Sequence, residues 1–400
     1  MSDGKAQRAG SPKGVQSSYH EDMAPTTEQV TEALGTVIDP EIRRPITELD
    51  MIKSVDVAAD GSVLVGVYLT VAGCPMRDKI TTDVTGAVSK ISGVTGVRVE
   101  LDVMSEEQRK NLQTKLRGSA EPMREIPFAQ PNSLTKVYAV ASGKGGVGKS
   151  SITVNLAVAL AATGRKVGVV DADIYGHSVP RMLGVSTRPT KVQDMIMPPS
   201  AYDVKVISVG MFTPGNTPVV WRGPMLHRAL QQFLGDVYWG DLDILLMDLP
   251  PGTGDIAISV AQLVPTAEIL VVTTPQKAAS EVAERAGAIA TQTHQQIVGV
   301  IENMSYLPCP HCGERTDVFG TGGGQLVADA LTRTLGARVP LLGQVPIDLR
   351  LREGGDDGRP LVLSDPDAPA AKELRTIADK ISGRSRSLLG RQLGLSPTRP

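Results

Sequence analysis

The chain has 400 residues, more than one ordinary hydrophobic core holds, which predicts two domains with tails. A formal net charge of −2 and an aromatic content of 3% argue against nucleic acid as a partner. Three cysteines are too few for a disulfide framework, and no apolar run reaches the roughly 18 residues of a membrane span. We therefore expect a cytoplasmic protein with no membrane partner.

The amino-terminal part predicts a tail, a small domain and a linker. Residues 1–25 are polar, rich in Gly and Ser and without the apolar centre of a signal peptide, so we expect a disordered tail. Residues 26–104 predict a small α/β domain. Its expected elements are a helix over 28–38, strands over 52–57 and 63–70, a helix over 78–89 and a strand over 94–103. The charged, Pro-punctuated segment 105–134 predicts a linker.

Residues 135–382 alternate between short apolar runs and helical patterns. This alternation predicts an α/β domain with a mostly parallel sheet covered by helices, because strands buried on both faces are apolar throughout. The expected strands are 137–141, 167–170, 204–209, 244–247, 269–273 and 297–302, with a helix over 152–162. The last segment, 383–400, is rich in Arg, Ser and Gly and predicts a flexible tail.

A Gly-rich loop between the first of these strands and the helix carries the strongest motif. It fits the pattern G-x-x-x-x-G-K-[ST] and predicts a P-loop NTPase that binds ATP. Lys149 is expected to reach the β- and γ-phosphates, and the Ser150 hydroxyl to bind Mg²⁺. The predicted nucleotide-binding residues of the loop are Gly143, Lys144, Gly145, Gly146, Val147, Gly148, Lys149, Ser150 and Ser151.

Two acidic positions follow predicted strands, at the sheet edge where doubly wound folds bind ligands. Asp248 ends the strand 244–247 and matches the Walker B aspartate, which holds Mg²⁺ through its water shell. Asp171 is either structural or assists Mg²⁺ through water. Gly252 is expected to donate its N–H to the γ-phosphate.

The second lysine, Lys144, makes the loop resemble the deviant Walker A of the family that contains MinD, ParA and the nitrogenase iron protein. This resemblance implies that Lys144 reaches the partner's phosphates across a dimer, where it would neutralise transition-state charge. The alternative is a solvated loop lysine. By the same resemblance Asp173 orients or deprotonates the attacking water, Asn303 grips the adenine edge, and the loop of Pro346, Ile347 and Asp348 closes over the base. Asn and Pro are also ordinary turn residues.

A Cys-x-x-Cys motif lies on a loop after Asn303, with both thiolates placed to face one ion. Cys309 and Cys312 supply only two ligands where a tetrahedral sulfur site needs four, so a symmetric homodimer would supply the missing pair. Either a bridging [4Fe–4S] cluster or a Cys₄ zinc fits. His311 is a possible further ligand, and a thioredoxin-like redox pair fits less well because that motif opens a helix.

Three segments together resemble the Mrp/ApbC family of iron–sulfur cluster carrier ATPases. They are the stretch around Trp221-Arg222, the stretch that begins at Asp248, and Asn303 with the cysteine pair. The resemblance covers roughly 135–380. It implies ATP hydrolysis, a labile cluster held between two protomers, and apo iron–sulfur proteins as acceptors.

The amino-terminal domain resembles the MIP18-like domain, through Thr70, Cys74 and Pro75. Cys74 is then either a transient cluster ligand at a helix start or a buried structural thiol. A positioning ATPase like MinD or ParA and a zinc-stapled regulatory dimer remain the alternative functions. The cysteine pair and the extra domain favour the cluster carrier.

Overall fold

The computed structural model describes residues 24–70, 76–117, 126–130, 132–173, 176–212, 223–252, 255–276 and 279–383. These residues form two compact units. The first contains residues 24–39, 44–69 and 76–103, and the second contains residues 40–43, residue 70 and the described residues from 104 onward. The predictions made for Cys74, Trp221, Arg222 and the two chain ends up to residue 23 and from 384 lie outside the described residues.

The first unit is built on a sheet that has three strands within the described residues, in the order β1-β2-β3. The strands β1 and β2 are antiparallel, and β2 and β3 are parallel with the helix α2 between them in the chain. A capping box at Thr26 begins α1, where the Thr26 hydroxyl and the Gln29 side chain each bond to the other's backbone N–H. The bounds are α1 Thr27–Leu34, β1 Ile52–Val57, β2 Ser62–Leu69, α2 Arg77–Val88 and β3 Gly96–Val103.

The second unit is centred on a sheet of eight strands among the described residues, in the order β15-β12-β11-β4-β10-β5-β9-β8. All neighbouring strands are parallel except β8 and β9. The predicted fold class, a mostly parallel α/β sheet with a small amino-terminal domain, is confirmed. The bounds are β4 Lys136–Ser142, β5 Val167–Asp171, β8 Ser200–Ala201, β9 Val204–Ser208, β10 Ile244–Asp248, β11 Glu268–Thr273, β12 Ile297–Asn303 and β15 Leu341–Val345.

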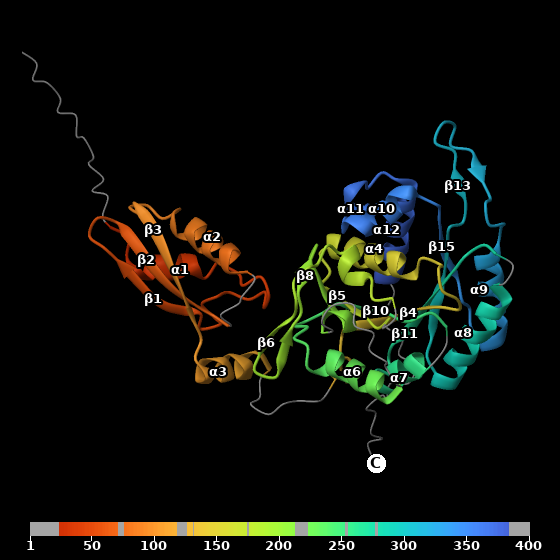
Figure 1. The fold of residues 1–400 in the computed structure, drawn as a ribbon, viewed down its shortest axis with the longest axis horizontal. Coiled ribbons are helices and arrows are strands. Elements are labelled where there is room, and N and C mark those ends of the chain that lie inside the picture. The colour runs from red at the N-terminus through yellow and green to blue at the C-terminus, as the bar shows by residue number, and fades with distance from the viewer. Residues whose placement is uncertain are drawn as a thin grey trace, which may run out of the picture. The chain divides into compact units, whose positions relative to one another are not determined.

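Helices cover both faces of this sheet, as Figure 1 shows. One face packs against α4, α10, α11 and α12, and the other against α6, α7 and α8. Alternate residues of one strand serve opposite faces: Tyr138 and Val140 of β4 lie in one core, and Val137 and Ala139 in the other. The bounds are α4 Lys149–Ala162, α5 Val179–Met182, α6 Gly223–Gly235, α7 Asp255–Leu263, α8 Ala279–Thr293, α9 Gly323–Leu335, α10 Leu349–Asp357, α11 Leu361–Ser364 and α12 Pro369–Ser382.

The strand β4 lies where the direction of sheet growth reverses. Later strands are added first on its β10 side and then on its β11 side. Open α/β sheets bind ligands at the carboxyl ends of the strands beside such a point. The Gly-rich loop begins directly after β4, so the fold places it at this position.

Two small hairpins extend from the body of the second unit. One pairs β6 (Thr190–Val192) with β7 (Met195–Met197), and the other pairs β13 (Leu307–Pro308) with β14 (Arg315–Thr316). The hairpin of β13 and β14 projects beyond the edge strand β15 and beyond the helix α9 (Figure 1).

Some elements differ from the sequence-based expectation. Within the segment predicted as a linker, residues Glu106–Arg117 form the helix α3, because Ser105 and Gln108 bond to each other's backbone N–H and Leu112 is buried. The helix predicted from 152 begins at Lys149, since Gly148 in the left-handed conformation (φ 77°) turns the chain into it. The strand β15 was not expected, although its pairing with β12 makes it part of the sheet.

Candidate functional site

The phosphate loop, residues 143–148, connects β4 to α4 and depends on glycines at both ends. A side chain at Gly143 would place its Cβ 2.7 Å from the Val282 side chain of α8. At Gly148, φ is 77° and a Cβ would collide with the Asn303 amide. Only glycine meets both requirements without strain. The amino terminus of α4, with its unpaired N–H groups, therefore follows directly on the loop, as an anion site requires.

Lys149 is almost completely buried, with 6% of its side chain exposed. Its Nζ lies 2.7 Å from Asp248 Oδ2, and the ammonium has no other acceptor among the described residues. A buried ammonium with unused donors is costly unless another acceptor is supplied. Phosphate oxygens at the loop would satisfy it, so the residues present fit a bound nucleotide.

Asp248, at the end of β10, is fully buried and collects two hydroxyl groups from the first turns of α4. Its Oδ2 accepts from Ser150 Oγ at 2.6 Å, and its Oδ1 accepts from Thr153 Oγ1 at 2.8 Å. The hydroxyl and carboxylate oxygens are the ligand types that Mg²⁺ binds, directly or through water, so this pair fits the ion. Thr153 was not singled out from the sequence. Its spacing of three from Ser150 places both on one helix face and is the signal that could have found it.

Asp171, the last residue of β5, is held by three donors. Its carboxylate accepts from the backbone N–H groups of Asp173 at 3.2 Å and Val179 at 3.3 Å, and from Ser208 Oγ at 3.1 Å. Burial, with the added negative charge of Asp248, raises the pKa of the Asp171 carboxyl well above its ordinary range. The geometry therefore favours the structural alternative, in which Asp171 holds the chain on either side of residues 174–175.

Asp173, the predicted water-orienting residue, is 9% exposed at the same sheet edge. Its Oδ1 accepts from the backbone N–H of Gly176 at 3.0 Å. Its carboxylate is thus fixed close to Asp171 and the strand end. Its role in catalysis stays a prediction.

Lys144 and Gly252 have partners within this chain. The Lys144 ammonium is hydrogen-bonded to Gln276 Oε1, which was not anticipated from the sequence. The Gly252 N–H donates to Ser142 O at 2.9 Å, so the prediction that it reaches the γ-phosphate requires this bond to open. Lys144 belongs to the phosphate loop, and Gly252 lies on the loop that follows β10, at the same carboxyl edge of the sheet.

The three residues predicted to contact the adenine lie in or beside different elements. Asn303 is 3% exposed, and its Nδ2 donates to Val147 O of the phosphate loop at 2.8 Å. Asp348 caps α10: it accepts the backbone N–H of Arg350 at 3.0 Å and pairs with its guanidinium at 2.8 Å. Pro346 lies in the connection from β15 to Asp348. The adenine contacts therefore remain predictions, while the contact of Asn303 with the phosphate loop is a new observation.

Cys309 and Cys312 lie in the turn between β13 and β14, and neither forms a disulfide. The Cys309 N–H donates to Glu314 O at 2.8 Å, and the Gly313 N–H donates to Cys309 O at 2.9 Å. The backbone N–H groups of Cys312 and His311, followed by the Cys312 thiol, lower the pKa of Cys309 by donating to its sulfur. Such a turn favours a thiolate that can bind a metal.

Ligand number limits what one chain can hold at this turn. Over the residues that the structure describes, no group of three or more His, Cys, Asp or Glu side chains is placed to hold a metal ion. Cys312 is exposed and Cys309 is half-buried, so both sulfurs remain accessible. A four-sulfur site at this position needs ligands from elsewhere.

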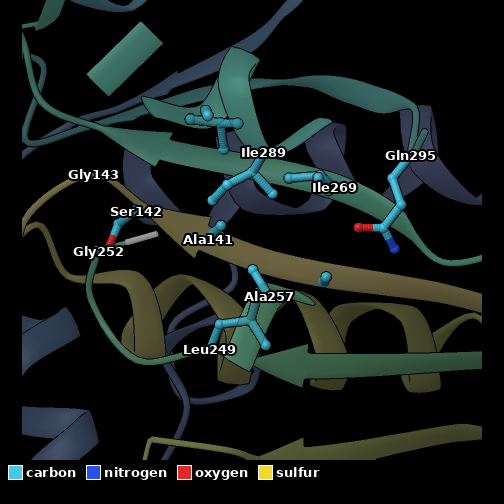
Figure 2. Close-up of a pocket in the computed structure, with 12 residues that line it drawn as sticks. Ala141, Ser142, Gly143, Leu249, Gly252, Ala257, Ile269, Ile289 and Gln295 are labelled. Atoms are coloured by element: carbon cyan, nitrogen blue, oxygen red, sulfur yellow. The ribbon is translucent and has the colours of Figure 1, made fainter. Parts of the chain in front are cut away.

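A small cavity lies behind the phosphate loop, between the sheet and the helices α7 and α8 (Figure 2). Its volume is about 20 Å³, and apolar side chains such as Leu249, Ile269 and Ile289 form most of its lining. Gln295 closes one end and has a buried Nε2 without a hydrogen-bond partner in the described part of the chain. This space holds about one water molecule. It is too small for a nucleotide.

Residues 133–382 match the family described as the NUBPL iron-transfer P-loop NTPase, and residues 27–101 match a family described as an iron–sulfur cluster assembly protein. The chain belongs to the NUBPL iron-transfer P-loop NTPase family. The resemblances to the iron–sulfur cluster carrier ATPases and to the MIP18-like domain are confirmed. This NUBPL-type chain is a P-loop ATPase.

Two relatives of this NUBPL-type chain match over nearly its whole length. An iron–sulfur cluster carrier protein of Mycobacterium tuberculosis is 66% identical over 92% of this chain and 97% of its own length. A protein of the same description from Synechocystis is 40% identical over 90% of this chain and 98% of its own length. A nucleotide-binding protein of Archaeoglobus fulgidus, solved with ADP, is 34% identical with a TM-score of 0.52, over 62% of this chain and 96% of that one.

None of the described helices is both long enough and apolar enough to cross a bilayer.

Proposed function

We propose that this chain is an ATP-dependent iron–sulfur cluster carrier. Two chains would hold a labile [4Fe–4S] cluster between their Cys309 and Cys312 thiolates, hydrolyse ATP and pass the cluster to apo-proteins in the reducing cytoplasm. The observation that carries the proposal is the exposed turn with two free thiols, on the same chain as a phosphate loop. The names of the relatives, each described as an iron–sulfur cluster carrier, support it.

The thiol chemistry agrees with transport rather than permanent storage. Backbone N–H groups that donate to a sulfur stabilise its thiolate, which is the form that binds iron. With two sulfurs per chain and no third ligand among the described residues, neither chain binds the cluster alone. A cluster shared between two exposed turns can be released when the two turns separate.

The nucleotide site supplies the ATPase. In the proposed arrangement Lys149 binds the β- and γ-phosphates, and Ser150 and Asp248 hold Mg²⁺, which supplies positive charge at the phosphates. Asp173 orients the attacking water. Lys144 leaves Gln276 and reaches the partner's phosphates, where its charge matters most as negative charge develops.

The amino-terminal unit would assist this carrier function. We place the domain at 26–104, joined to the ATPase domain of 135–382 by residues 105–134. Cys74 would be a transient ligand during cluster transfer, with a structural thiol as the alternative outcome.

The test is anaerobic reconstitution of the full chain with iron and sulfide, followed by transfer to an apo-ferredoxin. We expect about one cluster per two chains, because a four-sulfur site takes two ligands from each. Cys309→Ala and Cys312→Ala should each abolish the cluster and leave ATP binding intact. His311→Ala, in the same turn, tests the possible further ligand and should retain the cluster, because the proposed site uses the four thiolates alone.

Two results would contradict cluster carriage. One is binding of zinc without iron under reconstitution, which would favour the zinc-stapled dimer. The other is undiminished cluster transfer by the double cysteine variant, which would favour a positioning ATPase.

A further inference from the structure

The cysteine loop, residues 304–322, connects the end of β12 to the start of α9 and carries both thiols. Its first end is tied to the phosphate loop. Asn303, the last residue of β12, donates its Nδ2 to Val147 O at 2.8 Å, and both residues are buried. The cysteine loop therefore begins at a residue that is bonded to the loop that takes up phosphate.

The other end is tied to the neighbouring residue, Glu302. The backbone N–H of Gly324, in the first turn of α9, donates to Glu302 Oε2 at 2.5 Å. Gln344 of β15 donates its Nε2 to Glu302 Oε1 at 2.7 Å. Glu302 is fully buried, so its carboxylate is held by donors rather than by water. Both ends of the cysteine loop thus meet at two consecutive residues of one buried strand.

Glycines bring the second end unusually close to its neighbours. A Cβ at Gly324 would lie 2.7 Å from Glu302 Cβ, and one at Gly323 would lie 2.6 Å from Pro275 O. Pro275 precedes Gln276, the residue to which the Lys144 ammonium is bonded. The return end of the cysteine loop therefore packs on the segment that holds the deviant lysine.

A third set of bonds joins the start of the cysteine loop to the predicted adenine segment. The Ser305 N–H donates to Val345 O at 3.0 Å, and the Ile347 N–H donates to Tyr306 O at 2.7 Å. Pro346 lies between these two residues. The phosphate loop, the segment of Pro275 and Gln276, and the predicted adenine segment are thus each in contact with the base of the cysteine loop.

We propose that Glu302 is a positioning residue that couples the nucleotide site to the cysteine pair. It joins the return end of the cysteine loop to the strand whose next residue grips the phosphate loop. A shift of the phosphate loop on nucleotide binding is then passed to both ends of the loop together, which changes the presentation of Cys309 and Cys312. This inference rests on the proposed function for the meaning of the cysteines, but the coupling itself does not require a cluster.

Physical coupling of this kind needs contiguous, well-packed groups with two arrangements. The network supplies packed, hydrogen-bonded groups at every step from Val147 to Gly324. By linkage the effect is reciprocal, so occupation of the cysteines must change nucleotide affinity as nucleotide changes the cysteines.

The experiment measures alkylation of the metal-free full chain by iodoacetamide, with and without Mg²⁺ and the non-hydrolysed analogue adenylyl imidodiphosphate. Mass spectrometry follows the peptide that carries Cys309 and Cys312, which separates these thiols from Cys74. In the parent we expect the analogue to change the alkylation rate by about fivefold or more. Fivefold is about the smallest change in affinity that coupling between two sites usually produces. In Glu302→Gln that change should disappear while binding of the analogue is retained.

The variant is chosen because both contacts of the Glu302 carboxylate are with donors. A glutamine has the same size, but its NH₂ group faces one of these donors and cannot accept. The matched control is Glu373→Gln. Its carboxylate also accepts from Gln344, at the backbone N–H (3.0 Å), but bonds neither the cysteine loop nor the phosphate loop in the described structure. It should keep the parent response.

If Glu302→Gln does not fold, Gln344→Ala removes one of the two bonds and should weaken the response. A parent without any response, or a Glu302 variant with the full response, overturns the proposal. Neither result tests cluster carriage, which is decided by the binding of iron and sulfide. Failure of reconstitution in a parent that still shows the alkylation response would instead reject cluster carriage and keep the coupling.

Discussion

At the scale of single residues, the pair Lys149 and Asp248 organises the nucleotide site. Both are buried, and their charges are 2.7 Å apart. Asp248 also accepts hydrogen bonds from two hydroxyl groups, whereas the Lys149 ammonium has N–H donors with no further acceptor among the described residues. The aspartate is therefore satisfied within the chain, and the lysine is completed only by a further acceptor such as phosphate.

This asymmetry predicts the effect of Lys149→Ala. Asp248 keeps Ser150 and Thr153 as partners, so the variant should fold. A hydrogen bond to a charged group contributes about 1.5–3 kcal/mol, so the affinity for ATP should fall at least about tenfold. Isothermal titration calorimetry measures this directly. Lys372→Ala, at an exposed lysine of the same unit, is the matched control. Unchanged ATP affinity in Lys149→Ala would refute the phosphate assignment.

At the scale of elements, β12 and the hairpin of β13 and β14 combine opposite properties. Every residue of β12 is buried, while the turn that carries Cys312 is exposed. The base of the hairpin is thus fixed by the sheet, and its tip is open to a partner (Figure 1). A short hairpin on a rigid strand can present two thiols at a defined place without burying them.

The turn makes a prediction about the pH dependence of Cys309. Backbone N–H groups that donate to its sulfur favour the thiolate, so its pKa is lowered. An ordinary thiol has a pKa of about 8.5. Alkylation of Cys309 should therefore persist to a lower pH than alkylation of an ordinary thiol. The measurement is the pH–rate profile of the Cys309 peptide in metal-free protein. The same peptide in urea-unfolded chain is the control, and equal midpoints in the two states would contradict the prediction.

At the scale of the whole molecule, the proposed sites are complete only in a pair of chains. The cysteine turn supplies two of four sulfurs, and Lys144 is expected to act on the partner's phosphates. A symmetric dimer meets both needs at once, since each residue then contributes the same contact twice.

Mixing of two variants tests the role of Lys144 across the dimer. Lys144→Ala and Asp173→Asn should each bind ATP and hydrolyse it poorly, with a loss of about 10²–10⁴-fold where the general base is lost. In a mixed dimer one site combines an intact Asp173 with the partner's intact Lys144. Random mixing should then restore about a quarter of the parent rate, because half the dimers are mixed and each has one of two sites.

A sensitive phosphate-release assay at saturating ATP follows this recovery. The control adds each variant to itself at the same total concentration, where no recovery is expected. Normal hydrolysis by Lys144→Ala alone, or no recovery on mixing, would assign the lysine another role.

Much of the fold and of the phosphate loop was predictable from the sequence, because the determinants are local. The phosphate loop is marked by Gly143 and Gly148. An apolar run directly precedes them and a helical run directly follows, so the whole motif lies in one short stretch of sequence. Six strands of the large sheet were located as apolar runs, since burial on both faces leaves a pattern in each strand alone. The cysteine spacing was equally local.

The tertiary structure alone decided which distant residues share a site. Ser150 and Thr153 meet Asp248 across nearly a hundred positions of sequence. Glu302 meets Gln344 through the pairing of β12 with β15, and it meets Gly324 through the packing of α9 against β12. No local pattern marks Gln276 or Glu302, whose roles depend on what faces them. The physical reason is that a motif encodes backbone conformation, whereas the partner of a buried polar group is fixed by how strands and helices pack.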